Sequence, residues 1–219
     1  MSNKTTVEII DLGENINQKE TEYLRGAINK ILKPEDSIFH NHIDDKLAYK
    51  YPLIQYKSIN NKATIVALNE GIRAIKGLFP KTVELLLKNR SIYITPNYKK
   101  AQENVFDIEG NNTYKISNWL PFNQKNFKIY NESSSLIEKI KILEKILCGN
   151  ILSSAKGLGC FFEDRIVIEI LDIESIETLY YKGNPMKSLT ISFKTNCTIP
   201  LFISLGKGAS IGFGTITPK

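Results

Sequence analysis

The sequence has no apolar run approaching the roughly 18 residues that a membrane span needs, and it is poor in histidine and cysteine. Among 219 residues there are two histidines and three cysteines. An odd number of widely spaced cysteines (Cys148, Cys160 and Cys197) fits neither a disulfide framework nor a metal-binding cluster. The first residues contain no apolar stretch of signal-peptide length. These absences predict a cytoplasmic protein that is neither secreted nor embedded in a membrane.

The charge of the chain is moderately positive. There are 29 Lys and Arg against 23 Asp and Glu, which gives a net charge of +6. A positive excess is the electrostatic footprint of a protein that binds a polyanion, although many proteins that bind no nucleic acid are equally basic. Charge favours a nucleic-acid partner without establishing one.

In the first hundred residues, the spacing of apolar side chains alternates between the pattern typical of strands and the pattern typical of helices. Asn17 stands where it can cap the first helix, and Pro34 follows that helix. The predicted elements are a strand at Thr5–Asp11, a helix at Gln18–Leu32, strands at Ser37–Ile43, Tyr49–Lys57 and Ala63–Leu68, a helix at Glu70–Leu78 and a strand at Ser91–Thr95. The three middle segments are interpreted together as paired strands, and the pattern as a whole is that of a β, α, β, β, α, β unit.

The second half begins after a polar stretch near residues 99–103 and again combines a helix with strands. Ser135 and Glu138 have the spacing of a capping box, and Gly149 is predicted to end the helix that starts there. Turns are predicted at Asp172 and at Gly183-Asn184, and a last segment, Ile211–Ile216, closes the chain. The strand-like segments before it are Cys160–Leu171, Ile173–Tyr181, Leu189–Lys194 and Ile199–Ser204. The pattern predicts the α+β class, as two tandem ferredoxin-like (RRM-like) βαββαβ domains at residues 1–100 and 101–219.

The two histidines are separated by one residue, at His40 and His42. On a strand this spacing projects both imidazoles to one face, with Cα atoms about 6.5 Å apart, so the pair can bracket one phosphodiester. Cutting RNA without a metal requires a base for the 2′-hydroxyl and an acid for the leaving 5′-oxygen. Histidine can serve as either near neutral pH, because its unperturbed pKa is about 6.5.

Other interpretations of the histidine pair compete with this one. The pair could belong to a solvated surface strand. The segment His40–Asp45 also resembles the HxHxDH zinc signature superficially, but the chain has no further histidines, and Asp45 stands where the last histidine belongs. The letters HNH resemble the name of a nuclease motif whose residues are spread over a longer segment. We therefore predict no bound metal and no cofactor.

Polar residues on both sides of the histidines could complete an active site. A lysine would neutralise the charge on phosphorus, and a tyrosine hydroxyl could position the phosphate. The alternative is a solvated surface of mixed charge. The candidates are Lys30, Lys33, Lys46, Tyr49, Lys50 and Tyr51.

The segment Leu205–Ile216 has four glycines within nine positions. It lacks the spacing of a Walker loop, and the chain ends too soon for a dinucleotide-binding helix. Glycines could let backbone N–H groups approach a sugar-phosphate chain closely, and Lys207 and Ser210 could assist. The alternative is a tight glycine-rich hairpin. The residues predicted here to bind RNA are Gly206, Lys207, Gly208, Ser210 and Gly212.

The segment Trp119–Tyr130 interleaves four aromatic residues with Lys125 and Lys128. Aromatic rings beside cations suit the stacking of unpaired bases. Such rings also commonly form the edge of a hydrophobic core, and the sequence leaves both interpretations open.

Taken together, several segments resemble the CRISPR-associated endoribonucleases that cut repeat RNA, within the RAMP superfamily. The similarity spans nearly the whole chain and ends in the glycine-rich signature of that family. The matching segments are Leu24–Ile28, His40–Asp45, Tyr49–Lys57, Asn69–Ile72, Phe122–Phe127, Gly149–Gly159 and Gly206–Ile216.

The resemblance implies two ferredoxin-like domains, precursor CRISPR RNA as substrate, and one cut that leaves a 2′,3′-cyclic phosphate and a 5′-hydroxyl. It implies that His40 and His42 are catalytic, with Tyr49 as an auxiliary residue and Lys33 as our choice of catalytic lysine. Lys125, Lys156 and Lys207 are the predicted RNA-binding cations. A homodimer and association with other Cas proteins both remain open. The alternative function is a non-catalytic RAMP-type RNA-binding subunit of an interference complex.

Overall fold

The structure is a computed structural model that describes residues 3–31, 42–43, 46–47, 51–76 and 82–219. The chain divides into two compact units. The N-terminal unit consists of Thr5–Asn104 together with Ser210–Gly212, and the C-terminal unit consists of Met1–Lys4, Val105–Ala209 and Phe213–Lys219. The start of the chain and the short segment Ser210–Gly212 are therefore each part of the unit that is formed mainly by the other half.

The described residues of the N-terminal unit form one five-stranded sheet, two α-helices and two short hairpins. Its elements in chain order are β1 (Lys4–Asn15), η1 (Gln18–Glu20), α1 (Thr21–Ile31), β2 (His42–Ile43), β3 (Lys46–Leu47), β4 (Ile54–Ile59), β5 (Lys62–Leu68), α2 (Glu70–Ile75), β6 (Val83–Leu86), β7 (Ser91–Ile94), β8 (Asn97–Tyr98) and β9 (Gln102–Val105).

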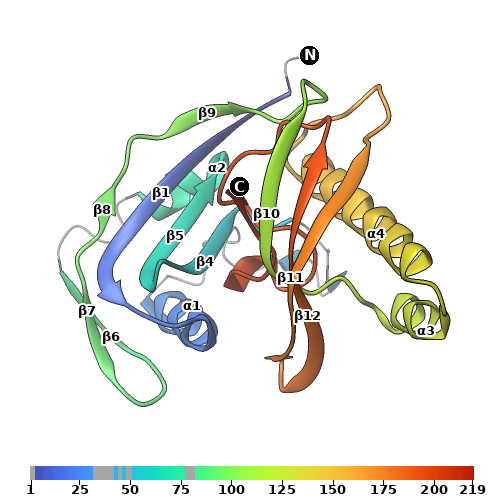
Figure 1. Cartoon of the computed structure of the whole chain (residues 1–219). Helices are drawn as coiled ribbons and strands as arrows, with labels where there is room; N and C mark the ends of the chain where they lie inside the picture. The colour runs from blue at the N-terminus through green and yellow to red at the C-terminus, as the bar shows by residue number, and fades with distance from the viewer. Residues whose placement is uncertain (1–2, 32–41, 44–45, 48–50, 77–81) are drawn as a thin grey trace. The chain divides into compact units, whose positions relative to one another are not determined.

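The order of strands in this sheet is β4-β5-β1-β8, and β9 also pairs with β1 (Figure 1). Without the two short hairpins, the sequence of elements is βαββαβ and the spatial order is second, third, first, fourth. That is the ferredoxin-like arrangement, in which each helix connects two strands that are not neighbours. The fold class expected from the sequence is confirmed for this unit.

The core of the N-terminal unit lies between the sheet and its helices. Because side chains alternate along a strand, Ile10 and Leu12 of β1 lie on the same face of the sheet. They join one buried cluster with Leu24 and Ile28 of α1. Asn17 caps the first turn as expected, and a complete capping box forms, in which Glu20 accepts a hydrogen bond from the Asn17 backbone. Local sequence thus determines where this helix begins.

The C-terminal unit repeats the same strand order. Its four-stranded antiparallel sheet runs β11-β12-β10-β13, which is again second, third, first, fourth (Figure 1). The short η2 stands between the third and fourth strands. The elements are β10 (Asn112–Trp119), α3 (Gln124–Glu132), α4 (Leu136–Gly157), β11 (Ile168–Tyr181), β12 (Asn184–Thr195), η2 (Ala209–Ile211) and β13 (Thr215–Pro218).

The long helix α4 corrects two predictions. Ser135 occupies the N-cap position, but its side chain makes no capping hydrogen bond, so the predicted capping box is absent from this helix. Gly149 does not end the helix, which continues to Gly157. A glycine inside a helix costs about 1 kcal/mol relative to alanine. Burial of Leu147 and Ile151 on both sides of Gly149 offsets that cost.

The predicted turn at Asp172 is also wrong, because β11 is one continuous strand. Its pairing with β12 shifts register between Ile170 and Asp172 and again between Ile173 and Ser175. At these irregularities the alternation of side chains between the two faces of the strand is interrupted. In the sequence, this interruption resembles a turn. At the first of the two shifts, the backbone N–H of Ile170 donates to the carboxylate of Glu144 on α4 over 3.1 Å. Within the described residues, none of the helices combines the length and apolarity needed to cross a membrane.

Candidate nucleic-acid interface

The predicted catalytic residues fall in the segment between α1 and β4. His40, Tyr49 and Lys33 lie outside the described residues. For His42 the backbone is described: it belongs to β2, opposite Leu47 of β3. The catalytic assignment therefore stays a prediction.

Described residues anchor the C-terminal end of this segment. Gln55 of β4 is fully buried, and its side-chain amide donates to the Tyr51 hydroxyl (3.0 Å) and to the carbonyl of Pro52 (3.1 Å). Gly71 lies close to the same stretch, because a Cβ there would be 2.5 Å from the carbonyl oxygen of Leu53. Gly71 of the matching segment Asn69–Ile72 is therefore required by packing.

In the C-terminal unit, the glycines of the glycine-rich segment approach the protein itself. A Cβ on Gly206 would lie 2.6 Å from Oδ1 of Asn150, which accepts a hydrogen bond from the indole of Trp119. A Cβ on Gly208 would lie 2.7 Å from the ring of Phe213. Both glycines have φ near +80°, at +82° and +75°. Packing and backbone conformation therefore require these glycines before any ligand is considered.

Gly214 offers the sharpest test of this packing. A Cβ there would lie 2.2 Å from the carbonyl oxygen of Leu205, and φ is +67°. We expect Gly214→Ala to lower the free energy of unfolding by about 2–4 kcal/mol, measured by denaturant unfolding. Gly183→Ala is the matched control, with φ +76° and open space around its Cβ. It should cost about 1 kcal/mol, and equal losses in the two variants would contradict the steric argument.

The predicted RNA-binding lysines differ in their surroundings. Lys207 is half-buried, and its ammonium group donates to the carbonyl of Phe122 over 3.2 Å. Lys125, in the first turn of α3, and Lys156, in the last turn of α4, are exposed. The hydrogen bond to Phe122 thus fixes the Lys207 ammonium group beside the glycines, whereas the side chains of Lys125 and Lys156 extend into solvent.

The tip of the glycine-rich segment, Ser210–Gly212, belongs to the N-terminal unit and is held there by the start of α1. The carbonyl of Ile211 accepts a hydrogen bond from the side-chain amide of Gln18 (2.9 Å), and the Thr21 hydroxyl lies 2.8 Å from the same oxygen. Arg25 donates to the hydroxyl of Ser210 over 3.2 Å. Two predicted RNA-binding residues, Ser210 and Gly212, therefore sit in an anchored tip.

The same tip packs against a buried lysine that the sequence did not single out. Lys57 of β4 is 1% exposed, and burial lowers its pKa well below the ordinary value. A Cβ on Gly212 would lie 3.3 Å from Cα of Lys57 and 3.0 Å from the carbonyl oxygen of Tyr56. Burial also raises the pKa of Tyr56. Gly212 is needed here because the two backbones approach each other.

The aromatic residues of Trp119–Tyr130 mostly form core. Trp119, Phe122 and Tyr130 are buried, whereas Phe127 of α3 is 39% exposed. Lys187 of β12 places its ammonium group 5.6 Å from the Phe127 ring centre and 5.4 Å from that of Tyr130. The three buried rings therefore belong to the edge of the hydrophobic core and are not free to stack on RNA bases. Lys187, which sequence reasoning missed, adds a cation beside the exposed ring.

In the part of the chain that the structure describes, no three side chains of His, Cys, Asp or Glu gather in a way that could hold a metal ion. The three cysteines are free thiols, and burial raises the pKa of each. Because His40 lies outside the described residues, the expectation of a metal-free site stays a prediction.

Comparison with known protein families gives matches over both halves of the chain. The Cas6b N-terminal domain family matches residues 3–104, and the Cas6b C-terminal domain family matches residues 108–219. An uncharacterized protein of Methanocaldococcus jannaschii is 35% identical over 135 residues, which are 61% of this chain and 90% of that protein.

Comparison with solved structures gives similar folds over the full length. The crystal structure of a Cas6b protein has a TM-score of 0.88 at 28% identity and is covered over 99% of each chain. The crystal structure of a CRISPR RNA processing endoribonuclease Cas6b has a TM-score of 0.75 at 24% identity, over 99% of this chain and 100% of that one. These likenesses agree with the ferredoxin-like strand order of both units.

Proposed function

The chain belongs to the Cas6b family, and we propose that it is an endoribonuclease that cuts CRISPR repeat RNA within the precursor transcript. The observation that carries this proposal is the match of both Cas6b domain families, at residues 3–104 and 108–219. The positive net charge of +6 supports an RNA substrate.

We assign the proton transfers of the cut to His40 and His42 as a pair. One imidazole removes the proton of a 2′-hydroxyl, whose oxygen then bonds to the adjacent phosphorus. The bond from phosphorus to the 5′-oxygen breaks, and the second imidazole protonates that oxygen. The products are a 2′,3′-cyclic phosphate and a 5′-hydroxyl. Tyr49 and Lys33 would stabilise the additional negative charge on phosphorus, by a hydroxyl hydrogen bond and by an ammonium charge.

The glycine-rich segment with Lys207, Lys125 and Lys156 is our candidate for holding the RNA backbone. Gly206 and Gly208 fix a left-handed backbone beside Lys207, whose ammonium group is tethered at Phe122. A preformed loop loses little conformational freedom on binding, which favours affinity for the phosphate chain. Lys125 and Lys156 would add phosphate contacts without base specificity.

Cleavage in excess EDTA tests this function and its independence of metal. We expect labelled repeat RNA, taken from the CRISPR array encoded with the protein, to be cut at the same rate with and without the chelator. Mass spectrometry of the products should find the cyclic phosphate and the 5′-hydroxyl.

Two controls accompany the chelation experiment. A metal-dependent ribonuclease in the same buffer must lose its activity, which shows that EDTA is effective. Loss of cleavage by this protein in EDTA, or products with a 5′-phosphate, would contradict metal-independent attack by the 2′-hydroxyl.

A further inference from the structure

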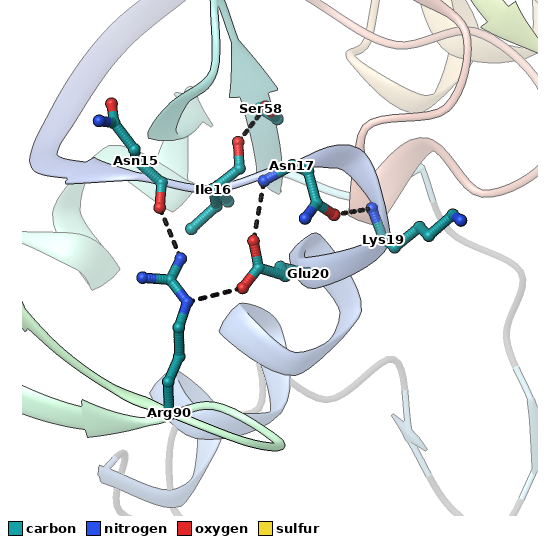
Figure 2. A network of polar contacts seen from close by, with 7 residues as sticks. All are labelled: Asn15, Ile16, Asn17, Lys19, Glu20, Ser58 and Arg90. Atoms are coloured by element: carbon teal, nitrogen blue, oxygen red, sulfur yellow. Dashed lines mark hydrogen bonds and ion pairs between the residues drawn. The ribbon is translucent and has the colours of Figure 1, made fainter.

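A polar network joins the turn between β6 and β7 to the start of the first helix (Figure 2). Arg90, in that turn, donates from Nε to the carboxylate of Glu20 (2.8 Å) and from Nη2 to the carbonyl of Asn15 (2.6 Å). The other carboxylate oxygen of Glu20 accepts the backbone N–H of Asn17 over 2.9 Å. One guanidinium thus ties together the end of β1 and the capping box of η1 and α1.

Further contacts hold the same turn in place. The Asn17 side chain accepts the backbone N–H of Lys19 (2.9 Å), and the Ser58 hydroxyl donates to the carbonyl of Ile16 (2.7 Å), as Figure 2 shows. Glu20 is 20% exposed, and its hydrogen bond from Arg90 holds its pKa below the usual value. The charged pair therefore persists at neutral pH and fixes the first helical turn from two sides.

Two other residues of this turn hold the tip of the glycine-rich segment. Gln18 lies two residues before Glu20 and Thr21 one residue after it, and both contact the carbonyl oxygen of Ile211. Their positions are set by the turn whose capping box Glu20 completes. The network around Arg90 thus holds the same turn that anchors Ser210–Gly212.

We propose that Arg90 and Glu20 are positioning residues for RNA binding, which fix the helical turn that holds the tip of the glycine-rich segment. Neither residue needs to touch RNA. The Arg90–Glu20 pair orients Gln18 and Thr21, and these two orient the Ile211 carbonyl and the backbone on either side of it. The inference rests on the proposed function, because it takes the glycine-rich segment as part of the RNA-binding surface.

The variant Glu20→Gln distinguishes an effect of positioning on RNA affinity from an effect of net charge. Glutamine can still accept the Asn17 N–H and so keep the capping box, but its amide cannot pair with the Arg90 charge. The change makes the protein more positive by one charge, so bulk electrostatics predicts tighter RNA binding. Positioning predicts the opposite: we expect the Kd for labelled repeat RNA to rise about fivefold, with the single-turnover rate at saturation changed less than about twofold.

Glu174→Gln is the matched control. It removes the carboxylate of another ion pair, Lys115–Glu174 between β10 and β11, and alters net charge equally. Its Kd should equal that of the wild type or fall. Thermal melts establish that both variants are folded at the assay temperature. In amide hydrogen exchange, peptides covering residues 210–213 should exchange faster in Glu20→Gln and at the wild-type rate in Glu174→Gln.

A double-mutant cycle with Thr21→Val tests whether Glu20 acts on RNA binding through the contact between Thr21 and the Ile211 carbonyl. Because both changes act on one contact, Glu20→Gln should add little to the Kd increase that Thr21→Val already causes. Wild-type RNA affinity and wild-type exchange in folded Glu20→Gln would overturn the positioning role alone. Failure of the wild-type protein to bind repeat RNA would instead contradict the proposed function, and the exchange experiment would still decide whether Glu20 holds the tip.

Discussion

Replacing His40 or His42 with alanine is expected to slow cleavage of repeat RNA by about a hundredfold or more, with RNA affinity changed less than about twofold. Each imidazole carries one proton transfer in the proposed mechanism. Without it, water must serve as a poorly placed acid or base. Binding should persist, because the phosphate contacts assigned to Lys207 and the other lysines are untouched. Single-turnover cleavage and a filter-binding isotherm measure the two quantities separately.

The comparison between the two variants also tests the division of roles. In the wild type, a general base and a general acid together give a bell-shaped dependence of the cleavage rate on pH. One variant should lose the limb that the base causes, and the other should lose the limb that the acid causes. Lys156→Ala serves as a control on binding, with weaker affinity and a cleavage rate at saturation close to wild type. A histidine variant with wild-type cleavage would remove that histidine from the mechanism.

A repeat RNA with 2′-deoxyribose at the nucleotide before the scissile phosphate is expected to resist cleavage at that bond completely. The attacking oxygen of the proposed mechanism is absent from this substrate, and no side chain can supply it. Gel analysis of an end-labelled substrate measures the effect over a long incubation.

The matched substrate carries deoxyribose at the next nucleotide, where the 2′-hydroxyl takes no part in the reaction. It should be cut within about threefold of the all-ribose rate, because it loses only binding contacts at that sugar. Cleavage at the modified bond itself would mean that water or another group attacks the phosphorus, as in metal-assisted hydrolysis.

The sequence predicted the fold class because local signals and the fold agree. The apolar period of β1 and the capping box at Asn17 specify elements whose order is that of the ferredoxin-like fold. The errors arose where tertiary packing overrides a local signal. Gly149 looks like a helix stop, yet buried neighbours carry α4 past it. Asp172 looks like a turn, yet pairing with β12 accommodates it through shifts in register.

The candidate site was less predictable, because neighbours in space are distant in sequence. Glycines at 206 and 208 suggested room for a ligand, but their close contacts are Asn150 and Phe213 of the protein. The burial of Lys57 could not be inferred from residue type, since lysine is mostly exposed. The tie between Arg90 and Glu20 joins residues 70 positions apart. Such contacts depend on the chain path and leave no periodic signal in the sequence.

The most direct test of the account is single-turnover cleavage by the double variant His40→Ala/His42→Ala, with RNA binding measured on the same preparation. The account predicts a folded protein that binds repeat RNA with near wild-type affinity and cuts it no faster than a buffer control. Cleavage at the wild-type site and rate would contradict the account, because the catalytic groups would then lie elsewhere in the chain.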